Sequence, residues 1–193
     1  MLRLDIPVYI ASKSPRRKKI LKQLGIKFKS ISIDVPEKFI RNEDSVTAVK
    51  RLAYEKLLEA QKHVRKGIII TADTIVVLDS KIIGKPKHKK DAVKILKSLS
   101  GKKHFVFTGF CIYNSVNNKI KIDYEKTEVY FRELKKHEID DYIKTGSPFD
   151  KAGAYGIQDD LGAVFIRKIN GCYYNVMGLP LSKVYSCLEQ VMY

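Results

Sequence analysis

The apolar run at residues 67–78 constrains this chain more than any other segment. It reads Gly-Ile-Ile-Ile-Thr-Ala-Asp-Thr-Ile-Val-Val-Leu, and its many β-branched residues predict a buried strand. Asp73 lies inside this run, where a carboxylate is costly unless it is paired, hydrogen-bonded or bound to a metal. Asp73 is therefore either a satisfied structural or strand-end residue or part of a functional site. Further polar segments, described below, favour a functional site.

The composition indicates one globular domain over residues 1–193, with room for two lobes, because 45% of the residues are hydrophobic. No apolar run approaches the roughly 20 residues that a membrane helix needs, and residues 1–7 lack the layout of a signal peptide. The three cysteines are far apart and suggest neither a metal-spaced pair nor a disulfide framework. We expect a cytoplasmic protein, because a reducing compartment suits this cysteine usage.

The formal net charge of +16 suggests nucleic acid as a partner, but the distribution of the charge does not. The 37 basic residues are scattered, no basic helix runs unbroken, and no aromatic-glycine RNA signature is present. A solvated, lysine-rich surface explains the charge better, and nucleic acid is not the expected partner. A general attraction for polyphosphates still follows from the charge.

Hydrophobic periodicity and turn residues predict alternating strands and helices. Strands are expected at 6–11, 28–33, 67–78, 82–84, 105–113, 120–131 and 163–169, and helices at 15–24, 45–63, 91–99, 135–144 and from 180. The turn at 114–118 predicts an antiparallel hairpin. The fold class is therefore α/β with a mixed central sheet.

The long helix at 45–63 begins at Ser45, which we expect to cap it. One face of this helix is formed by residues at helical spacing, namely Val49, Leu52, Ala53, Lys56, Leu57 and Ala60.

The first polar segment, residues 11–19, joins a strand end to a helix start at Pro15. Free backbone N–H groups and the helix dipole favour an anion at such a place, and the hydroxyls of Ser12 and Ser14 add to it. Arg16 and Arg17 offer planar guanidinium groups suited to phosphate, although cations oppose the dipole there. The alternatives are a polyphosphate site and a solvated basic cap.

The second and third segments are weaker. Asp34 and Glu37 leave a strand together, which is common before a helix. Lys85 lies between Gly84 and Pro86, and a hairpin after the 67–78 strand would return it toward Asp73. An ordinary turn lysine would look the same.

The fourth segment, residues 145–158, is the longest stretch of polar residues and glycines. Small residues allow the backbone to approach a ligand closely. Lys151, Tyr155 and Gln158 offer a charge, a stacking ring and an amide that can read a base edge. A structured surface loop is the alternative.

In sequence order, these segments resemble the Maf family of nucleoside triphosphate pyrophosphatases. The resemblance covers nearly the whole chain. The matching motifs are Ala11-Ser12-x-Ser14-Pro15-Arg16-Arg17, Ala72-Asp73-Thr74, Gly84-Lys85-Pro86, Leu99-Ser100-Gly101-x-x-His104, Thr108-Gly109, the run at 150–158, Ile169-x-Gly171 and Val176-x-Gly178-Leu179-Pro180.

The resemblance implies cleavage of a nucleoside triphosphate to a monophosphate and pyrophosphate, with a divalent metal, Mg²⁺ or Mn²⁺, in the cytoplasm. It also implies an elongated α/β fold with two lobes around a cleft, similar to the inosine triphosphate pyrophosphatase architecture. A homodimer is common in such folds. Arg16, Thr74 and Gln158 match the subfamily that acts on dTTP and UTP rather than the sister subfamily that acts on 7-methyl-GTP.

The resemblance also implies roles for individual residues. The expected catalytic residues are Asp73, as the acid-base residue, Glu37 and Lys85. Asp73 and Glu37 are also the candidate metal ligands, with Asp34 as an alternative to Glu37. The residues expected to bind substrate phosphates are Ser12, Ser14, Arg16, Arg17, Lys85 and Lys151. Thr74 and Gln158 are expected to read the base, and Arg16 could do either.

Two features depart from the family pattern. Thr71 stands where the family usually has Gly, and the 159–162 segment is one residue longer, with Asp159 in place of Gly.

Two rival functions stay open. One is hydrolysis of 7-methyl-GTP or other modified nucleotides, and the other is a nucleotide- or nucleic-acid-binding role in the regulation of cell division.

Overall fold

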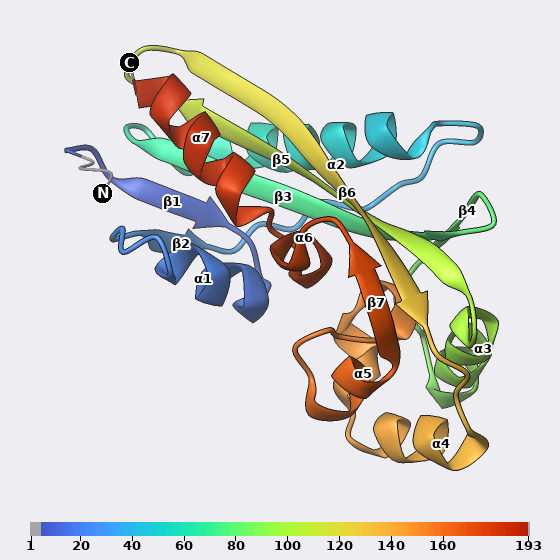
Figure 1. Cartoon of the computed structure of the whole chain (residues 1–193). Helices are drawn as coiled ribbons and strands as arrows, with labels where there is room; N and C mark the ends of the chain where they lie inside the picture. Colours follow the sequence, from blue (N-terminus) through green and yellow to red (C-terminus); the bar gives the residue numbers. More distant parts are fainter. Residues whose placement is uncertain (1–4, 193) are drawn as a thin grey trace. The chain divides into compact units, whose positions relative to one another are not determined.

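The computed structural model describes residues 5–192, apart from the side chain of Asp160. It contains a seven-stranded mixed sheet with strand order β2-β1-β3-β5-β6-β7, and β4 pairs with β3 off this path (Figure 1). The strands are β1 Val8–Ala11, β2 Lys29–Ile31, β3 Ile68–Leu78, β4 Lys81–Ile83, β5 Lys103–Asn114, β6 Lys119–Phe131 and β7 Ile166–Asn170. The predicted fold class, a mixed sheet flanked by helices, is confirmed.

Seven α-helices and two short 3₁₀ segments complete the described part of the chain. The helices are α1 Pro15–Lys22, α2 Ser45–Gln61, α3 Lys89–Leu99, α4 Lys136–Lys144, α5 Asp160–Val164, α6 Tyr173–Met177 and α7 Leu181–Met192, and the 3₁₀ segments are η1 Ser147–Asp150 and η2 Ala152–Ala154. Among the described residues no helix is long and apolar enough to cross a membrane.

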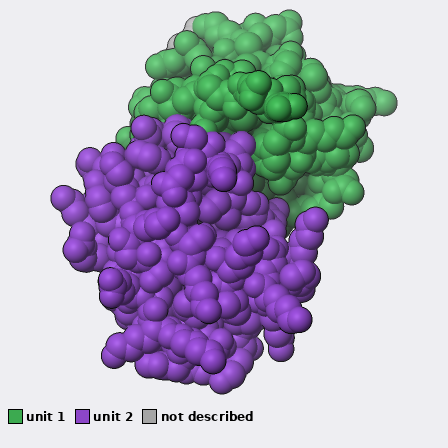
Figure 2. Space-filling model, turned by 90° about the vertical axis from the view of Figure 1, so that its right-hand side faces the viewer, with its two compact units in different colours: residues 1–73, 108–125, 178–193 green, residues 74–107, 126–177 purple. Residues whose placement is uncertain are grey.

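The chain forms two compact units, each assembled from separate segments (Figure 2). Unit 1 contains residues 1–73, 108–125 and 178–193, and unit 2 contains residues 74–107 and 126–177. The boundary between the units falls inside β3, between Asp73 and Thr74.

In unit 1, β1 pairs in parallel with both β2 and β3. Parallel neighbours need crossover connections, and α1 and α2 provide them. Figure 1 shows α2 and α7 on opposite faces of these strands. The apolar face of α2 packs in a core with residues of β1, β3 and β5. This core contains Ala11, Ile33, Ala53, Leu57, Ala60, Val64, Ile69 and Cys111.

In unit 2, β3 turns back into the antiparallel strand β4, and β6 pairs antiparallel with β7. The core between these strands and helices α3 and α4 is rich in aromatic rings. It includes Leu96, Val106, Val129, Phe131, Tyr142, Tyr155 and Phe165. Edge-to-face contacts join Phe131 to Tyr155 and Tyr142 to Phe165, with ring centroids 4.7 Å and 5.2 Å apart.

Two sequence predictions need correction, and one short helix was missed. Asp44 rather than Ser45 caps α2, because its carboxylate accepts hydrogen bonds from the backbone N–H groups of Val46 and Thr47, both at 3.0 Å. The strand expected at 163–169 begins at Ile166, since residues 160–164 form α5. Helix α6 was not predicted, and its five residues are too short to show helical periodicity.

Candidate functional site

The first cluster of polar residues lies in unit 1, around Asp73 on β3. Ile69, Thr71 and Asp73 share one face of β3 because strand residues alternate, and Ile69 packs in the core under α2. Asp73 is 3% exposed. The strand therefore delivers this carboxylate to the buried surface that α2 covers.

Lys56 of α2 forms an ion pair with Asp73. Its ammonium donates to Asp73 Oδ1, and it also donates to Glu37 Oε1 at 2.9 Å. The structure thus brings Glu37 and Asp73 to one shared cation, whereas Asp34 lies at the exposed surface and pairs with Lys13. The sequence analysis placed Lys56 on the buried face of its helix without assigning it to the site. A lysine among apolar residues at helical spacing was the signal that could have found it.

The surroundings of Asp73 set its protonation. Burial raises the pKa of Asp73 above its ordinary value, the charge of Lys56 opposes this shift, and Glu37 adds to it. A carboxylate with a raised pKa accepts a proton more readily than an ordinary aspartate. Asp73 is therefore suited to proton transfer.

The turn into α1 supplies hydroxyls and guanidinium groups to unit 1. Ser14 caps α1, and its hydroxyl accepts from the backbone N–H of Arg17 at 3.4 Å. Ser12 Oγ accepts from the backbone N–H of Ser14 at 3.2 Å and from Arg17 at 3.4 Å. Both serines, expected to bind phosphate, hold the turn that presents the helix N-terminus.

Arg17 connects this turn to the carboxylates. Its Nε donates to the carbonyl of Gly178 at 2.8 Å, which fixes the guanidinium. Burial lowers the pKa of Arg17, and the negative charge of Asp73 is the strongest opposing influence. The same group is thus tied to the chain and electrostatically coupled to Asp73. Arg16 lies one residue earlier in the first turn and is partly exposed.

Thr71 and Gly109 set the distance between α2 and the sheet. The Thr71 hydroxyl donates to the carbonyl of Ala53 at 2.7 Å, so the departure from the family's usual glycine adds a bond between β3 and α2. A Cβ at Gly109 would lie 2.3 Å from the carbonyl oxygen of Val49. The strands and α2 therefore touch backbone to backbone in the part of unit 1 that holds Lys56.

The second cluster lies in unit 2, in the loop after α4. Lys151 is buried and donates to Ser147 O at 2.5 Å, to Ser147 Oγ at 3.0 Å and to Asp150 Oδ1 at 2.7 Å, and it lies 3.1 Å from Asp159 Oδ2. An ammonium group has three donors, so Lys151 would have to exchange a partner to bind a phosphate. Its predicted role as a phosphate clamp stays a prediction.

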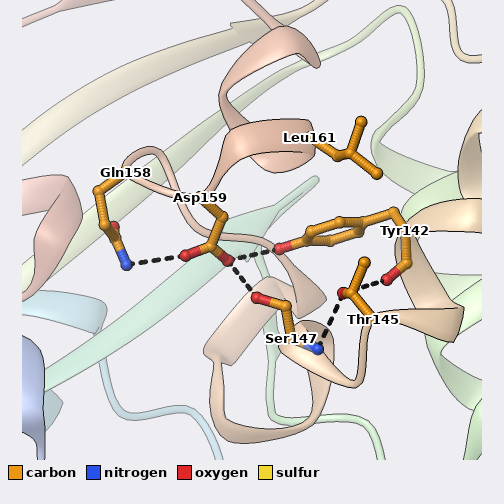
Figure 3. A pocket seen from close by; sticks show the side chains of 6 residues that line it. All are labelled: Tyr142, Thr145, Ser147, Gln158, Asp159 and Leu161. Carbon is orange, nitrogen blue, oxygen red and sulfur yellow. Dashed lines mark hydrogen bonds between the residues drawn. The ribbon is translucent and has the colours of Figure 1, made fainter.

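A pocket of about 490 Å³ opens beside this loop. Its lining residues are Tyr142, Thr145, Ser147, Gln158, Asp159 and Leu161 (Figure 3). Gln158 thus lies at a pocket, as a residue that reads a ligand must. Its amide nitrogen donates to Asp159 Oδ1 at 3.1 Å.

Two further predicted residues belong to unit 2. Lys85 is exposed and follows β4, whose register with β3, Val76 opposite Ile83, leads the chain back toward Thr74. The neighbouring Gly84 accepts a hydrogen bond at 3.1 Å from the backbone N–H of Gly153. The Gly84-Lys85-Pro86 motif is thereby joined to the glycine-containing loop. Thr74 is partly buried on β3.

The site residues therefore fall into one set in each unit. Unit 1 holds Ser12, Ser14, Arg16, Arg17, Glu37, Lys56 and Asp73, and unit 2 holds Thr74, Lys85, Lys151, Gln158 and Asp159. The unit 1 set provides a buried carboxylate, a second carboxylate and cations, a combination suited to proton transfer beside an anionic ligand.

Two carboxylates also suit a divalent metal. Carboxylate oxygens are the ligands that Mg²⁺ and Mn²⁺ prefer, and Mg²⁺ usually takes one or two of them together with phosphate oxygens and water. Among residues 5–192 no group of three or more His, Cys, Asp or Glu side chains could hold a metal. Lys56 binds one oxygen of each carboxylate, so Glu37 and Asp73 would have to hold a metal through their second oxygens, with further ligands from outside the chain.

Comparisons with known proteins concern the fold, the relatives and the family of this chain. A HAM1 protein from Coxiella burnetii shares the fold, with a TM-score of 0.50 and 13% sequence identity over 96% of this chain and 99% of that chain. A protein of Syntrophomonas wolfei named dTTP/UTP pyrophosphatase is 47% identical over 94% of this chain and 95% of its own length. A protein of Aquifex aeolicus with the same name is 47% identical over 95% of each. The model of the family described as Maf-like protein matches residues 7–191, so the chain belongs to the Maf-like family.

Proposed function

We propose that this protein is a nucleoside triphosphate pyrophosphatase that hydrolyses dTTP and UTP to the nucleoside monophosphate and pyrophosphate. The observation that carries the proposal is the convergence of Asp73 and Glu37 on Lys56 within unit 1. The names of the Syntrophomonas and Aquifex relatives support the choice of substrates. We further propose that the protein acts in the cytoplasm, where its three free cysteines would stay reduced.

Asp73 is the general base in this proposal. Lys56 holds one carboxylate oxygen, Oδ1, which leaves the second oxygen to accept a proton from water. The water oxygen forms a bond to the α phosphorus, opposite the oxygen that bridges to the β phosphate. The bond from the α phosphorus to that bridging oxygen breaks, and pyrophosphate leaves. The water proton passes to Asp73. Catalysis of this kind depends mainly on positioning and electrostatics.

The cations neutralise the triphosphate in this proposal. Arg17, fixed by Gly178, contacts phosphate oxygens together with the N-terminus of α1, and Arg16 assists at the phosphates or the base. Lys85 and Lys151 are the other cations proposed to contact phosphate oxygens, Lys151 in exchange for one of its present partners. Thr74 and Gln158 read the pyrimidine base.

Glu37 would hold Mg²⁺ or Mn²⁺ in this proposal, because Lys56 and the water proton take the two oxygens of Asp73. When bound, a divalent metal would supply neutralisation of the charge that grows on the leaving pyrophosphate. Glu37→Gln removes one anionic ligand, so the metal concentration at half-maximal rate should rise by about tenfold. Metal titrations of both proteins with UTP measure it. A glutamine variant with the metal dependence of the wild type would show that Glu37 is not a ligand.

The decisive experiment measures pyrophosphate release with Mg²⁺ or Mn²⁺ from dTTP, UTP, CTP, ATP, GTP and 7-methyl-GTP, with Asp73→Asn alongside. Loss of a general base should lower the rate by about 10²- to 10⁴-fold. Selective turnover of dTTP and UTP that disappears in the variant is the expected result. Turnover of 7-methyl-GTP instead would overturn the substrate assignment. A variant that keeps more than about half of the rate would overturn the role of Asp73.

A further inference from the structure

Asp159 occupies an unusual position for an aspartate at the start of a helix. It is the N-cap residue of α5, yet its side chain makes no capping hydrogen bond. Aspartate at this position commonly accepts from the first backbone N–H groups of the helix. The carboxylate instead turns into the loop after α4, where it accepts hydrogen bonds from Tyr142, Ser147 and Gln158 (Figure 3). It also forms an ion pair with Lys151.

The two oxygens of Asp159 have separate partners. Oδ2 accepts from Tyr142 at 2.8 Å and from Ser147 Oγ at 2.5 Å, and it lies 3.1 Å from Lys151 Nζ. Oδ1 accepts from Gln158 Nε2 at 3.1 Å. The three partners on Oδ2 fix the carboxylate, so Oδ1 is a fixed acceptor for the amide of Gln158.

The fold makes room for this arrangement. A Cβ at Gly156 would lie 2.6 Å from Asp159 Oδ2 and 2.7 Å from Lys151 Cε, so only glycine allows the pair to pack there. The Asp159 side chain is 16% exposed and that of Lys151 is 8% exposed. The carboxylate is thus built into the wall of the pocket that Gln158 also lines.

A fixed acceptor determines which way the Gln158 amide faces. An amide has an oxygen that accepts and a nitrogen with two protons, and the two ends have similar shape. Only the nitrogen can face a carboxylate favourably, since an amide oxygen would place two acceptors against each other. One amide proton of Gln158 is donated to Asp159, so the second amide proton and Oε1 of Gln158 remain for a ligand in the pocket.

That orientation distinguishes uracil and thymine from cytosine. Uracil and thymine present an O4 acceptor beside an N3–H donor, which match the remaining amide proton and Oε1 of Gln158. Cytosine presents an amino donor at C4 beside an N3 acceptor, the opposite order. Reading cytosine in the same pose would require the amide to turn over and place Oε1 against Asp159.

We propose that Asp159 is a specificity-determining positioning residue that fixes the orientation of the Gln158 amide and so excludes cytosine nucleotides. This inference rests on the proposed function, in which Gln158 reads the base. Loss of a hydrogen bond to a charged group corresponds to about 10- to 100-fold in relative rate. The wild type should therefore prefer UTP to CTP by about that factor in kcat/KM.

The test compares kcat/KM for UTP and CTP in the wild type and in Asp159→Asn. Asparagine has the same shape but can offer either an oxygen or a nitrogen to Gln158, so both amide orientations become acceptable. The ratio of UTP to CTP should fall by about tenfold. The matched control is Asp141→Asn, the same change at an exposed residue of α4 that pairs with Lys144 at 2.8 Å, and it should leave the ratio unchanged.

The outcomes separate this inference from the proposed function. Equal loss of UTP and CTP turnover in Asp159→Asn would mean that Asp159 only supports the loop, which overturns the inference. Gln158→Ala should abolish the preference. If the preference survives that change, base reading by Gln158 is wrong and the inference falls with it. If it disappears while Asp159→Asn keeps the wild-type ratio, only the inference fails.

If Asp159→Asn does not fold, a nuclear magnetic resonance measurement on the wild type tests the inference instead. The side-chain amide of Gln158 in the wild type is identified in a nitrogen–proton correlation spectrum by its absence from Gln158→Ala. A proton bonded to a carboxylate should be displaced downfield from the positions of exposed glutamine amides. Signals that coincide with those of exposed amides would contradict the proposed bond.

Discussion

At the scale of single residues, the buried ion pair between Lys56 and Asp73 is the centre of the unit 1 site. Asp73 could be predicted because a carboxylate in a β-branched run has few structural uses. Lys56 could not be assigned, because a helix pattern places it on a face without showing which strand residue it meets. Asp159 was noticed as a departure from the family pattern, and only the folded loop shows its four partners.

Replacement of Lys56 tests the electrostatics of the site. The charge of Lys56 lowers the pKa of Asp73 against the effect of burial, so Lys56→Gln should raise that pKa further. The basic form of Asp73 exists above its pKa. The acid limb of the pH profile of kcat/KM should therefore move to higher pH, and the rate should recover there in part.

The matched control is Lys62→Gln, at the end of the same helix. Lys62 is 69% exposed in its side chain and pairs with Glu59. This variant should keep the wild-type pH profile. A profile for Lys56→Gln that merely drops in height, without moving along the pH axis, would contradict the coupling between Lys56 and Asp73.

At the scale of elements, the long amphipathic segments were predictable and the short ones were not. Helix α2 and strand β3 were expected within a few residues of their bounds, because each carries a sustained periodic pattern. Helices α5 and α6 have five residues each, and tertiary contacts rather than periodicity determine them. The same holds for η1 and η2, which the sequence showed only as a loop.

Gly109→Ala tests the contact between β5 and α2. The new Cβ would overlap the carbonyl group of Val49, and backbone atoms cannot move aside as a flexible side chain does. Overpacking of this kind should lower the free energy of unfolding by about 1–3 kcal/mol. Urea unfolding followed by circular dichroism measures the loss.

Gly84→Ala is the matched control for stability. A Cβ at Gly84 meets no atom within 4 Å, so this change should leave the free energy of unfolding within about 0.5 kcal/mol of the wild type. Equal stability of the two alanine variants would show that α2 can shift freely on the sheet.

At the scale of the whole molecule, the mixed sheet was predictable from the alternation of elements, whereas the composition of the two units was not. Each unit combines segments far apart in the sequence, and local patterns carry no information about such pairing. The division of β3 between Asp73 and Thr74 is a property of the packed molecule alone.

His104 should make the stability of the protein depend on pH. It is fully buried in unit 2, its Nε2 lies 2.7 Å from Tyr155 Oη, and its Nδ1 has no partner among the described residues. Burial lowers its pKa to about 4, below the ordinary value of 6.5. The unfolded chain therefore takes up a proton first as the pH falls, and the contribution of His104 to stability is present above pH 6.5 and lost toward pH 4.

Between pH 7 and pH 5 this loss should amount to about 2 kcal/mol. Guanidinium unfolding at both pH values measures the free energy of unfolding. Between pH 7 and pH 5 this free energy should fall by about 2 kcal/mol less in His104→Gln than in the wild type. The exposed His137 gives the control, since His137→Gln should keep the wild-type dependence. A glutamine variant at 104 with an unchanged dependence would mean that other groups cause the acid sensitivity.

The backbone contact between Gly109 and Val49 has a consequence for the evolution of this family. Helix α2 carries Lys56, so a side chain gained at position 109 would displace the ammonium as well as the helix. A substitution far from any substrate atom would then change the rate, and a second change elsewhere in α2 would be needed to restore it. Positions along this contact should therefore vary in compensating pairs across descendants of this chain rather than one at a time.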